Sequence, residues 1–191
     1  MNPYFTSFHE YLHRLGLSED IIREIMQCYL VKTYKKEEYF ASVDERSDKL
    51  GFVVNGLFYM YTIKQDGTFF TKDFITKEQF LLAAYGPENG STVNIKAIKA
   101  SVILEAKYSD IRKLLDKYHE IEVLSKKRTE KELEAICQKM AQYATMTAKD
   151  RYIMFKEKFA VYEEKIPQYL IASYLGITPT QLSRIRNRLK N

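Results

Sequence analysis

The sequence predicts an α+β protein that consists of an N-terminal antiparallel β-barrel or jelly-roll, a long helix and a C-terminal all-α helix-turn-helix domain. Aromatic and β-branched runs separated by turn signals fill residues 31–108. A helical pattern then continues from about residue 120 to 143, and residues 166–190 carry the signals of two short crossing helices. We therefore expect three parts: residues 1–119 with the barrel, residues 120–145 with the long helix and a hinge, and residues 146–191 with the helix-turn-helix.

Two short helices are expected before the barrel, over residues 4–15 and 18–30. Ser18 is the expected N-cap of the second helix. The acids Glu19 and Asp20 in its first turn interact favourably with the helix dipole. These helices are expected to serve packing.

The barrel prediction rests on apolar runs at residues 50–54, 57–63, 69–75 and 93–104. The pair Asp66-Gly67 lies between two of these runs and is a strong hairpin marker. Many short strands with turns at this spacing are typical of an antiparallel sandwich or barrel.

The long helix carries an apolar stripe in its second half, whereas residues 125–132 are almost wholly polar. Two interpretations are open: the stripe covers the sheet, or it packs against the same helix of a second copy. We favour the second and expect the dimer interface to consist of Leu133, Ile136, Cys137, Met140 and Ala144. Thr147, with Asp150 three residues later, is expected to cap a further helix that continues through residues 151–160.

The helix-turn-helix prediction starts with a helix over residues 167–175, in which small Ala172 lets the two helices cross closely. Gly176 supplies the tight turn, since glycine adopts a left-handed conformation at little cost. Thr178 and Gln181 have the spacing of a capping box, with Pro179 at the first helical position. The second helix then buries one face, which consists of Leu182, Ile185 and Leu189.

The opposite face of this second helix is basic and free of acids. Arginine can donate two hydrogen bonds to guanine and asparagine can pair with adenine, whereas serine and threonine reach base edges or phosphates. The predicted DNA-binding residues are Thr178, Thr180, Gln181, Ser183, Arg184, Arg186, Asn187 and Arg188. We expect Arg186, Arg188 and Lys190 to contact phosphates. The competing interpretation is an ordinary solvated basic helix.

The composition of the chain favours a protein that binds a polyanion and argues against an enzyme. The formal net charge of +5 over 191 residues favours a polyanionic partner, and residues 166–191 contain no Asp or Glu. Residues 31–108 contain no histidine, which argues against a metal-dependent enzyme, and no nucleophile motif or phosphate loop is present. We therefore expect no enzyme.

No metal and no cofactor are predicted, because the chain has only two cysteines and three scattered histidines. Cys28 and Cys137 are interpreted as buried free thiols of a reducing compartment, although a redox switch is the alternative. His9 and His13 have metal-binding spacing, but without a third ligand we interpret them as surface residues. The absence of an apolar run of membrane length and of a leader peptide predicts a soluble cytoplasmic protein.

The order of barrel, long helix and helix-turn-helix resembles the bacterial Crp/Fnr superfamily of transcription regulators. The resemblance covers nearly the whole chain and is strongest in Thr147-Ala-Lys-Asp-Arg-Tyr152 and in the segment from Ile166-Pro167 through Leu182-Ser-Arg-Ile185. It implies a cyclic-nucleotide-binding-like barrel and a homodimer that binds double-stranded DNA at an inverted-repeat operator and alters transcription. By position, Arg184 matches the arginine most often used on guanine and Thr178 matches a common phosphate contact.

The sequence departs from the family at the cyclic-nucleotide cassette, residues 77–93, where Ser91-Thr92 replaces the usual Arg-Ser or Arg-Thr pair. Without that cation a bound cyclic phosphate would be desolvated unpaired, so cyclic AMP and cyclic GMP are not expected. An unidentified small-molecule effector and a contact with RNA polymerase remain open. The alternative function is a sensing or protein-interaction module whose helix-turn-helix does not bind DNA.

Overall fold

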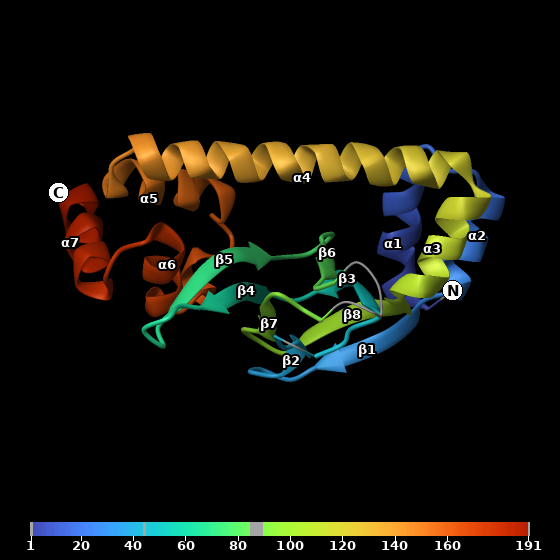
Figure 1. Cartoon of the computed structure of the whole chain (residues 1–191), viewed down its shortest axis with the longest axis horizontal. Coiled ribbons are helices and arrows are strands. Elements are labelled where there is room, and N and C mark those ends of the chain that lie inside the picture. Colours follow the sequence, from blue (N-terminus) through green and yellow to red (C-terminus); the bar gives the residue numbers. More distant parts are fainter. Residues whose placement is uncertain (1, 44, 85–89, 191) are drawn as a thin grey trace. The chain divides into compact units, whose positions relative to one another are not determined.

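The computed structural model describes residues 2–43, 45–84 and 90–190, and two antiparallel four-stranded sheets form its β part (Figure 1). The strand orders are β1-β8-β3-β6 and β2-β7-β4-β5. The strands are β1 Leu30–Tyr34, β2 Tyr39–Ala41, β3 Lys49–Asn55, β4 Phe58–Ile63, β5 Phe69–Ile75, β6 Phe80–Leu82, β7 Asn94–Ala97 and β8 Ser101–Lys107. The α+β class and the antiparallel barrel or jelly-roll are confirmed.

Strand β3 is buried on both of its faces, which explains its unbroken apolar run. Val53 belongs to the cluster that fills the space between the sheets, with Phe40 and Phe58. Phe52 points the other way, and its ring lies 4.5 Å, centroid to centroid, from that of Phe8. Phe8 comes from helix α1 (Pro3–Arg14), which with α2 (Glu19–Gln27) covers the outer face of this sheet. One strand thus joins two hydrophobic cores.

The second helix is shorter than its predicted range of 18–30, because it ends at Gln27. Leu30 is instead the first residue of β1 and pairs with Glu105 of β8. Ser18 occupies the N-cap position with extended backbone, but its side chain makes no capping hydrogen bond. Asn2 caps α1, where its Oδ1 accepts the Tyr4 N–H at 3.1 Å.

The Asp66-Gly67 hairpin is confirmed between β4 and β5. The Lys64 N–H donates to the Thr68 carbonyl at 2.7 Å, and Asp66 Oδ1 accepts the Thr68 N–H at 2.9 Å. Gly67 has φ +78°, the left-handed conformation that glycine favours.

The apolar run at 93–104, which the sequence presents as one segment, consists of two strands. It contains β7 and β8, which belong to different sheets: β7 pairs with β2 and β4, and β8 pairs with β1 and β3. The chain therefore changes sheet at residues 98–100, where the buried Ser101 Oγ donates to the Lys99 carbonyl at 2.8 Å. Hydrophobicity alone did not reveal this change, because both strands are buried.

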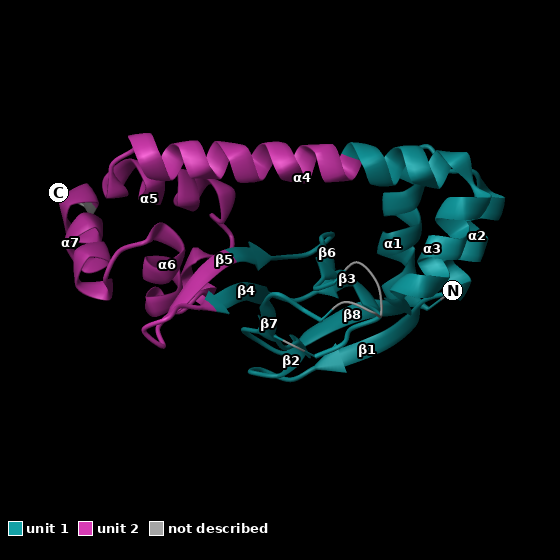
Figure 2. Ribbon diagram, viewed as in Figure 1, with its two compact units in different colours: residues 1–62, 73–127 teal, residues 63–72, 128–191 magenta. Residues whose placement is uncertain are grey.

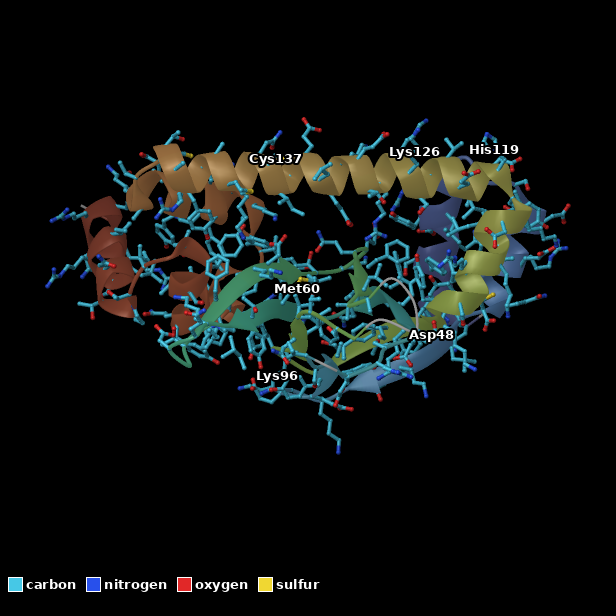
Figure 3. The ribbon with its side chains drawn as sticks, in the orientation of Figure 1. Asp48, Met60, Lys96, His119, Lys126 and Cys137 are labelled. Atoms are coloured by element: carbon cyan, nitrogen blue, oxygen red, sulfur yellow. The ribbon has the colours of Figure 1, made fainter. Side chains whose placement is uncertain are left out.

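Helix returns as predicted after the barrel, with α3 (Tyr108–Lys117), α4 (His119–Thr145) and α5 (Ala148–Lys158). Asp48, labelled in Figure 3, caps α3: its Oδ1 accepts the Ser109 N–H at 2.9 Å and its Oδ2 accepts the Ser109 hydroxyl at 2.6 Å. The remaining helical elements are the 3-10 turn η1 (Glu163–Lys165), α6 (Gln168–Leu175) and α7 (Pro179–Lys190). Thr147 caps α5 through the Asp150 N–H, as expected.

The chain divides into two compact units, residues 1–62 with 73–127 and residues 63–72 with 128–191 (Figure 2). The first unit contains most of the two sheets, α1 to α3 and the first turns of α4. The second unit contains the rest of α4, the hairpin 63–72 and the helices α5, α6 and α7. The predicted nucleic-acid residues all lie in the second unit.

Candidate nucleic-acid interface

Helices α6 and α7 meet across a tight turn at Gly176, as the sequence predicted. Gly176 has φ +67°, and the Ile177 N–H donates to the Ala172 carbonyl at 3.0 Å, which closes the end of α6. The small core of the motif consists of Leu170, Ile171, Ala172, Leu175 and Leu182, all of which are buried. The turn and the core together fix the crossing of the two helices.

The capping box at the start of α7 is present. The Thr178 Oγ1 accepts the Gln181 N–H at 3.2 Å, and the Gln181 Oε1 accepts the Thr178 N–H at 2.9 Å. Both side chains are also exposed. A role in DNA contact for Thr178 or Gln181 would therefore compete with the cap, because the Thr178 hydroxyl also donates to Gln181 Oε1 at 3.3 Å.

The outward face of α7 is exposed and without acids. Its exposed polar side chains are those of Thr180, Gln181, Ser183, Arg184, Asn187 and Arg188. On a helix of about 3.6 residues per turn, Arg184 and Asn187 lie on one side, and Arg188 lies one turn beyond Arg184. This arrangement gives an α-helix with donors suited to base edges and phosphates. The Lys190 side chain lies outside the described residues.

Arg186 does not share that face. Its Nε donates to the Tyr152 hydroxyl at 2.9 Å and its Nη2 lies 3.0 Å from Glu163 Oε1. Only 20% of the Arg186 side chain and 17% of the Glu163 side chain are exposed. The expectation that Arg186 contacts phosphate therefore conflicts with its position, because residue 186 follows buried Leu182 by four and so lies near the inner face.

Tyr152 links the Arg186 side chain to α5. Its hydroxyl donates to Glu163 Oε1 and accepts from Arg186, and its ring lies beneath the guanidinium at 5.6 Å. Burial raises the pKa of the Tyr152 phenol, and the hydrogen bond to Glu163 adds to this effect. The phenol therefore stays protonated and keeps donating to the carboxylate.

Leu189 was expected in the core of the motif but is more than a third exposed, and Ile185 is half-buried. Apolar burial of α7 is thus strongest at Leu182 and fades toward the C-terminal end. The polar contacts of Arg186 occur where the apolar contacts weaken.

The hinge between α4 and α5 is closed by Arg151. Its guanidinium donates to the Met146 carbonyl at 2.7 Å and to the Leu175 carbonyl at 3.1 Å, and it lies 5.1 Å from the centre of the Tyr143 ring. Tyr143 also donates to the Tyr174 carbonyl. Sequence reasoning missed this group, since no spacing pattern indicates that residue 151 reaches the ends of two other helices.

The hairpin of residues 63–72 contacts α6 through Ser173. The Ser173 hydroxyl donates to the Phe69 carbonyl at 3.0 Å and accepts the Thr71 N–H at 2.9 Å. The Lys139 ammonium lies 3.7 Å from the centre of the Tyr174 ring and donates to the Lys72 carbonyl. Two segments that are distant in sequence, the hairpin and α4, therefore converge on the first helix of the motif.

The apolar stripe of α4 lies open to solvent in the single chain. The exposed fractions are 61% for Leu133, 58% for Ile136 and 68% for Met140, and Cys137 (labelled in Figure 3) and Ala144 are exposed as well. No described residue of α4 is buried. The expectation that Cys137 is a buried thiol is therefore wrong for the single chain, whereas Cys28 is half-buried and burial raises its pKa.

The space between the two sheets is filled by side chains. Phe40, Phe58, Val53, Ile95 and Ile103 are almost completely inaccessible to water. Of the cassette at 77–93, residues 85–89 lie outside the described part. Ser91, one of the residues that stand in place of the usual cationic pair, is buried, and its hydroxyl donates to the Val93 carbonyl at 2.5 Å.

His9 Nε2 lies 3.0 Å from Glu19 Oε2, and among the described residues no three His, Cys, Asp or Glu side chains could hold a metal ion together. None of the described helices is both long enough and apolar enough to cross a bilayer.

Comparison with known proteins gives likeness in structure without likeness in sequence. No family model and no curated protein sequence matches the chain. FixK2 from Bradyrhizobium japonicum is similar with a TM-score of 0.77 at 20% identity, covering 85% of this chain and 84% of FixK2. A mutant of CooA from Carboxydothermus hydrogenoformans is similar with a TM-score of 0.73 at 15% identity, covering 94% of this chain and 84% of CooA.

A further solved structure, a putative transcriptional regulator of the Crp/Fnr family from Eubacterium rectale, has a TM-score of 0.72 at 14% identity. The match covers 98% of this chain and 87% of that protein. The chain has the fold of the Crp/Fnr transcription regulators.

Proposed function

We propose that this protein is a sequence-specific, DNA-binding transcription regulator that acts as a homodimer on an inverted-repeat operator. The observation that carries the proposal is the outward face of α7, which presents Arg184, Asn187 and Arg188 without an acidic residue. A helix of this width enters a major groove, and these residue types read base edges and bind phosphates. The fold shared with Crp/Fnr regulators supports the same role.

The homodimer is supported by the exposed stripe on α4. Leu133, Ile136 and Met140 recur at a spacing that forms one seam along the helix, and they are exposed in the single chain. Large apolar side chains gathered on one helix face are typical of an interface. A second copy of the same helix is the occupant that we propose, because two-fold pairing would set two α7 helices against one duplex.

In this mechanism each protomer places α7 in one major-groove half-site, and the two half-sites lie about one helical turn apart. Arg184 reads a guanine, whereas Arg188 binds the backbone. The packed barrel serves as a scaffold, since its interior is filled by Phe40, Phe58 and their neighbours. An effector therefore would bind outside the space between the sheets.

Selection of bound sequences from a random double-stranded DNA pool at about physiological salt tests this function, because non-specific phosphate contacts are screened there. The expected result is an inverted repeat. Recovery of no sequence above background, by protein that is folded and dimeric, would instead favour the alternative of a sensing or protein-interaction module whose helix-turn-helix does not bind DNA.

A further inference from the structure

We propose that Arg186 is a positioning residue: through Tyr152 and Glu163 it fastens the C-terminal half of the recognition helix α7 to α5 and η1, and it is not a phosphate contact. The DNA-binding part of this inference rests on the proposed function. The fastening itself concerns the free protein and can be tested without DNA.

The geometry of the contacts supports this role. The two ends of the Arg186 guanidinium engage different partners, with Nε on the Tyr152 hydroxyl at 2.9 Å and Nη2 on Glu163 Oε1 at 3.0 Å. Tyr152 in turn donates to the same carboxylate oxygen. Three side chains from three helical elements therefore form one closed network. A planar, forked guanidinium is suited to bridging two oxygen atoms in this way.

Burial separates Arg186 from its neighbours on α7. Arg184 and Arg188 are exposed, whereas four fifths of the Arg186 side chain is covered. To reach a phosphate, Arg186 would have to leave Glu163 as a half-buried carboxylate without its cation, which is unfavourable. The charges of the pair also offset each other, so Arg186 adds little net charge to the DNA-facing side.

The place of the network along α7 indicates what it does. Leu182 anchors the first half of the helix by complete burial, but Ile185 is only half-buried and Leu189 is more than a third exposed. The second half, which presents Asn187 and Arg188, thus depends on Arg186 for its attachment. Loss of that attachment would make the position of the base-reading residues less well defined. It would change the net charge of the DNA-facing side much less.

The decisive variant is Glu163→Gln, because the two roles of Arg186 predict opposite changes in DNA affinity. If Arg186 were a phosphate contact held back by Glu163, neutralising Glu163 would free it, tighten DNA binding and steepen the dependence of log K on log salt by about one phosphate. If Arg186 positions α7, Glu163→Gln weakens specific binding although it removes a negative charge.

We expect Glu163→Gln and Arg186→Met each to lower the ratio of specific to non-specific DNA affinity by about 3- to 30-fold. Both should leave the salt slope unchanged. The matched control is Arg188→Met, an exposed arginine on the same helix, which should reduce the slope by about one and leave the ratio nearly constant. The DNA is the sequence recovered from the random pool, compared with a scrambled duplex of equal length.

Hydrogen exchange of the free protein separates failure of this inference from failure of the proposed function. Backbone amides of residues 186–189 should exchange faster in Arg186→Met and Glu163→Gln than in the wild type and in Arg188→Met. Thermal unfolding identifies any variant that fails to fold. If either Arg186→Met or Glu163→Gln fails, the other variant is used for the test. Unchanged exchange in both variants, or tighter and more salt-dependent binding by Glu163→Gln, would overturn the inference. A wild type that binds no DNA would remove the proposed function while the exchange result still decides the fastening.

Discussion

The Ser173 hydroxyl accepts a hydrogen bond from the Thr71 N–H at 2.9 Å. Thr71 lies in β5, an edge strand of its sheet, and is completely buried. Edge strands present backbone groups without a strand partner, and here a side chain from α6 satisfies two of them, since Ser173 also donates to the Phe69 carbonyl. The Ser173 hydroxyl thus makes the backbone hydrogen bonds that a neighbouring strand would make.

Replacing Ser173 by alanine should lower the free energy of unfolding by about 1–3 kcal/mol, because it leaves the buried Thr71 N–H without an acceptor. Urea unfolding measures the change, and the Thr71 amide should exchange faster. Ser183→Ala, at an exposed position of α7, is the matched control and should be nearly neutral. An unchanged Thr71 exchange rate would contradict the role given to Ser173.

Gly176→Ala should destabilise the protein more than Gly67→Ala. Both glycines have positive φ, +67° and +78°, so each alanine carries the backbone cost of about 1–2 kcal/mol. A Cβ at Gly176 would in addition lie 3.2 Å from Tyr143 Cε1, whereas a Cβ at Gly67 would meet nothing within 4 Å. The difference between the two variants in urea unfolding isolates the contact with Tyr143. Equal losses would mean that Tyr143 moves aside freely.

Met140→Lys should convert the dimer to a monomer, because it places a charge in the centre of the apolar seam of α4. Sedimentation velocity gives the mass directly. Gln138→Lys adds the same charge to an exposed position off the stripe and should remain a dimer. A wild type that sediments as a monomer at all accessible concentrations would refute the proposed pairing.

Arg184→Ala should reduce the sequence specificity of DNA binding, whereas Arg188→Ala should reduce the affinity for all DNA. Loss of Arg184 should cost about 1–3 kcal/mol on the specific site and relax the choice of one base, as expected for a guanine contact. Loss of Arg188 should weaken specific and random DNA alike. Competition binding against single-base operator variants measures both effects. If Arg184→Ala lowered specific and random binding equally, it would not be the base-reading residue.

Stability in acid should depend on Glu24. Hydrogen bonds from Lys117 and Tyr118 hold the pKa of the Glu24 carboxyl below its ordinary value of 4.5. A lowered folded-state pKa contributes stability above the unfolded value, and this contribution is lost as the pH falls through the folded value. Wild type should therefore melt higher than Glu24→Gln at pH 7, and the two melting temperatures should converge below pH 4.5. A constant gap across that range would exclude the linkage.

The local signals in the sequence were reliable where one short segment determines the structure. The capping box of Thr178 and Gln181, the turn at Gly176 and the hairpin at Asp66-Gly67 each depend on residues within a few positions of one another. Their geometry follows from backbone preferences and short-range hydrogen bonds. The structure contains all three.

The sequence was less informative where contacts between distant segments decide. Its charge predicts a phosphate contact for Arg186, and the sequence does not reveal that Tyr152 and Glu163, from two other elements, hold this side chain. Its spacing of four from Leu182 was the available signal that it lies near the buried face. Arg151 offered no such signal, because its acceptors are the carbonyls at the ends of two helices. The change from one sheet to the other at residues 98–100 was not predicted for a related reason. Strands β7 and β8 are both buried, so their sequences have the same apolar pattern.

The two carbonyl bonds of Arg151 share one rigid, planar group. A turn of α6 against the end of α4 that stretches one bond also pulls the guanidinium away from the other. Small displacements are therefore resisted twice, whereas a large one releases both bonds together. We therefore expect the end of α4 and helix α6 to keep one relative angle until both bonds break together.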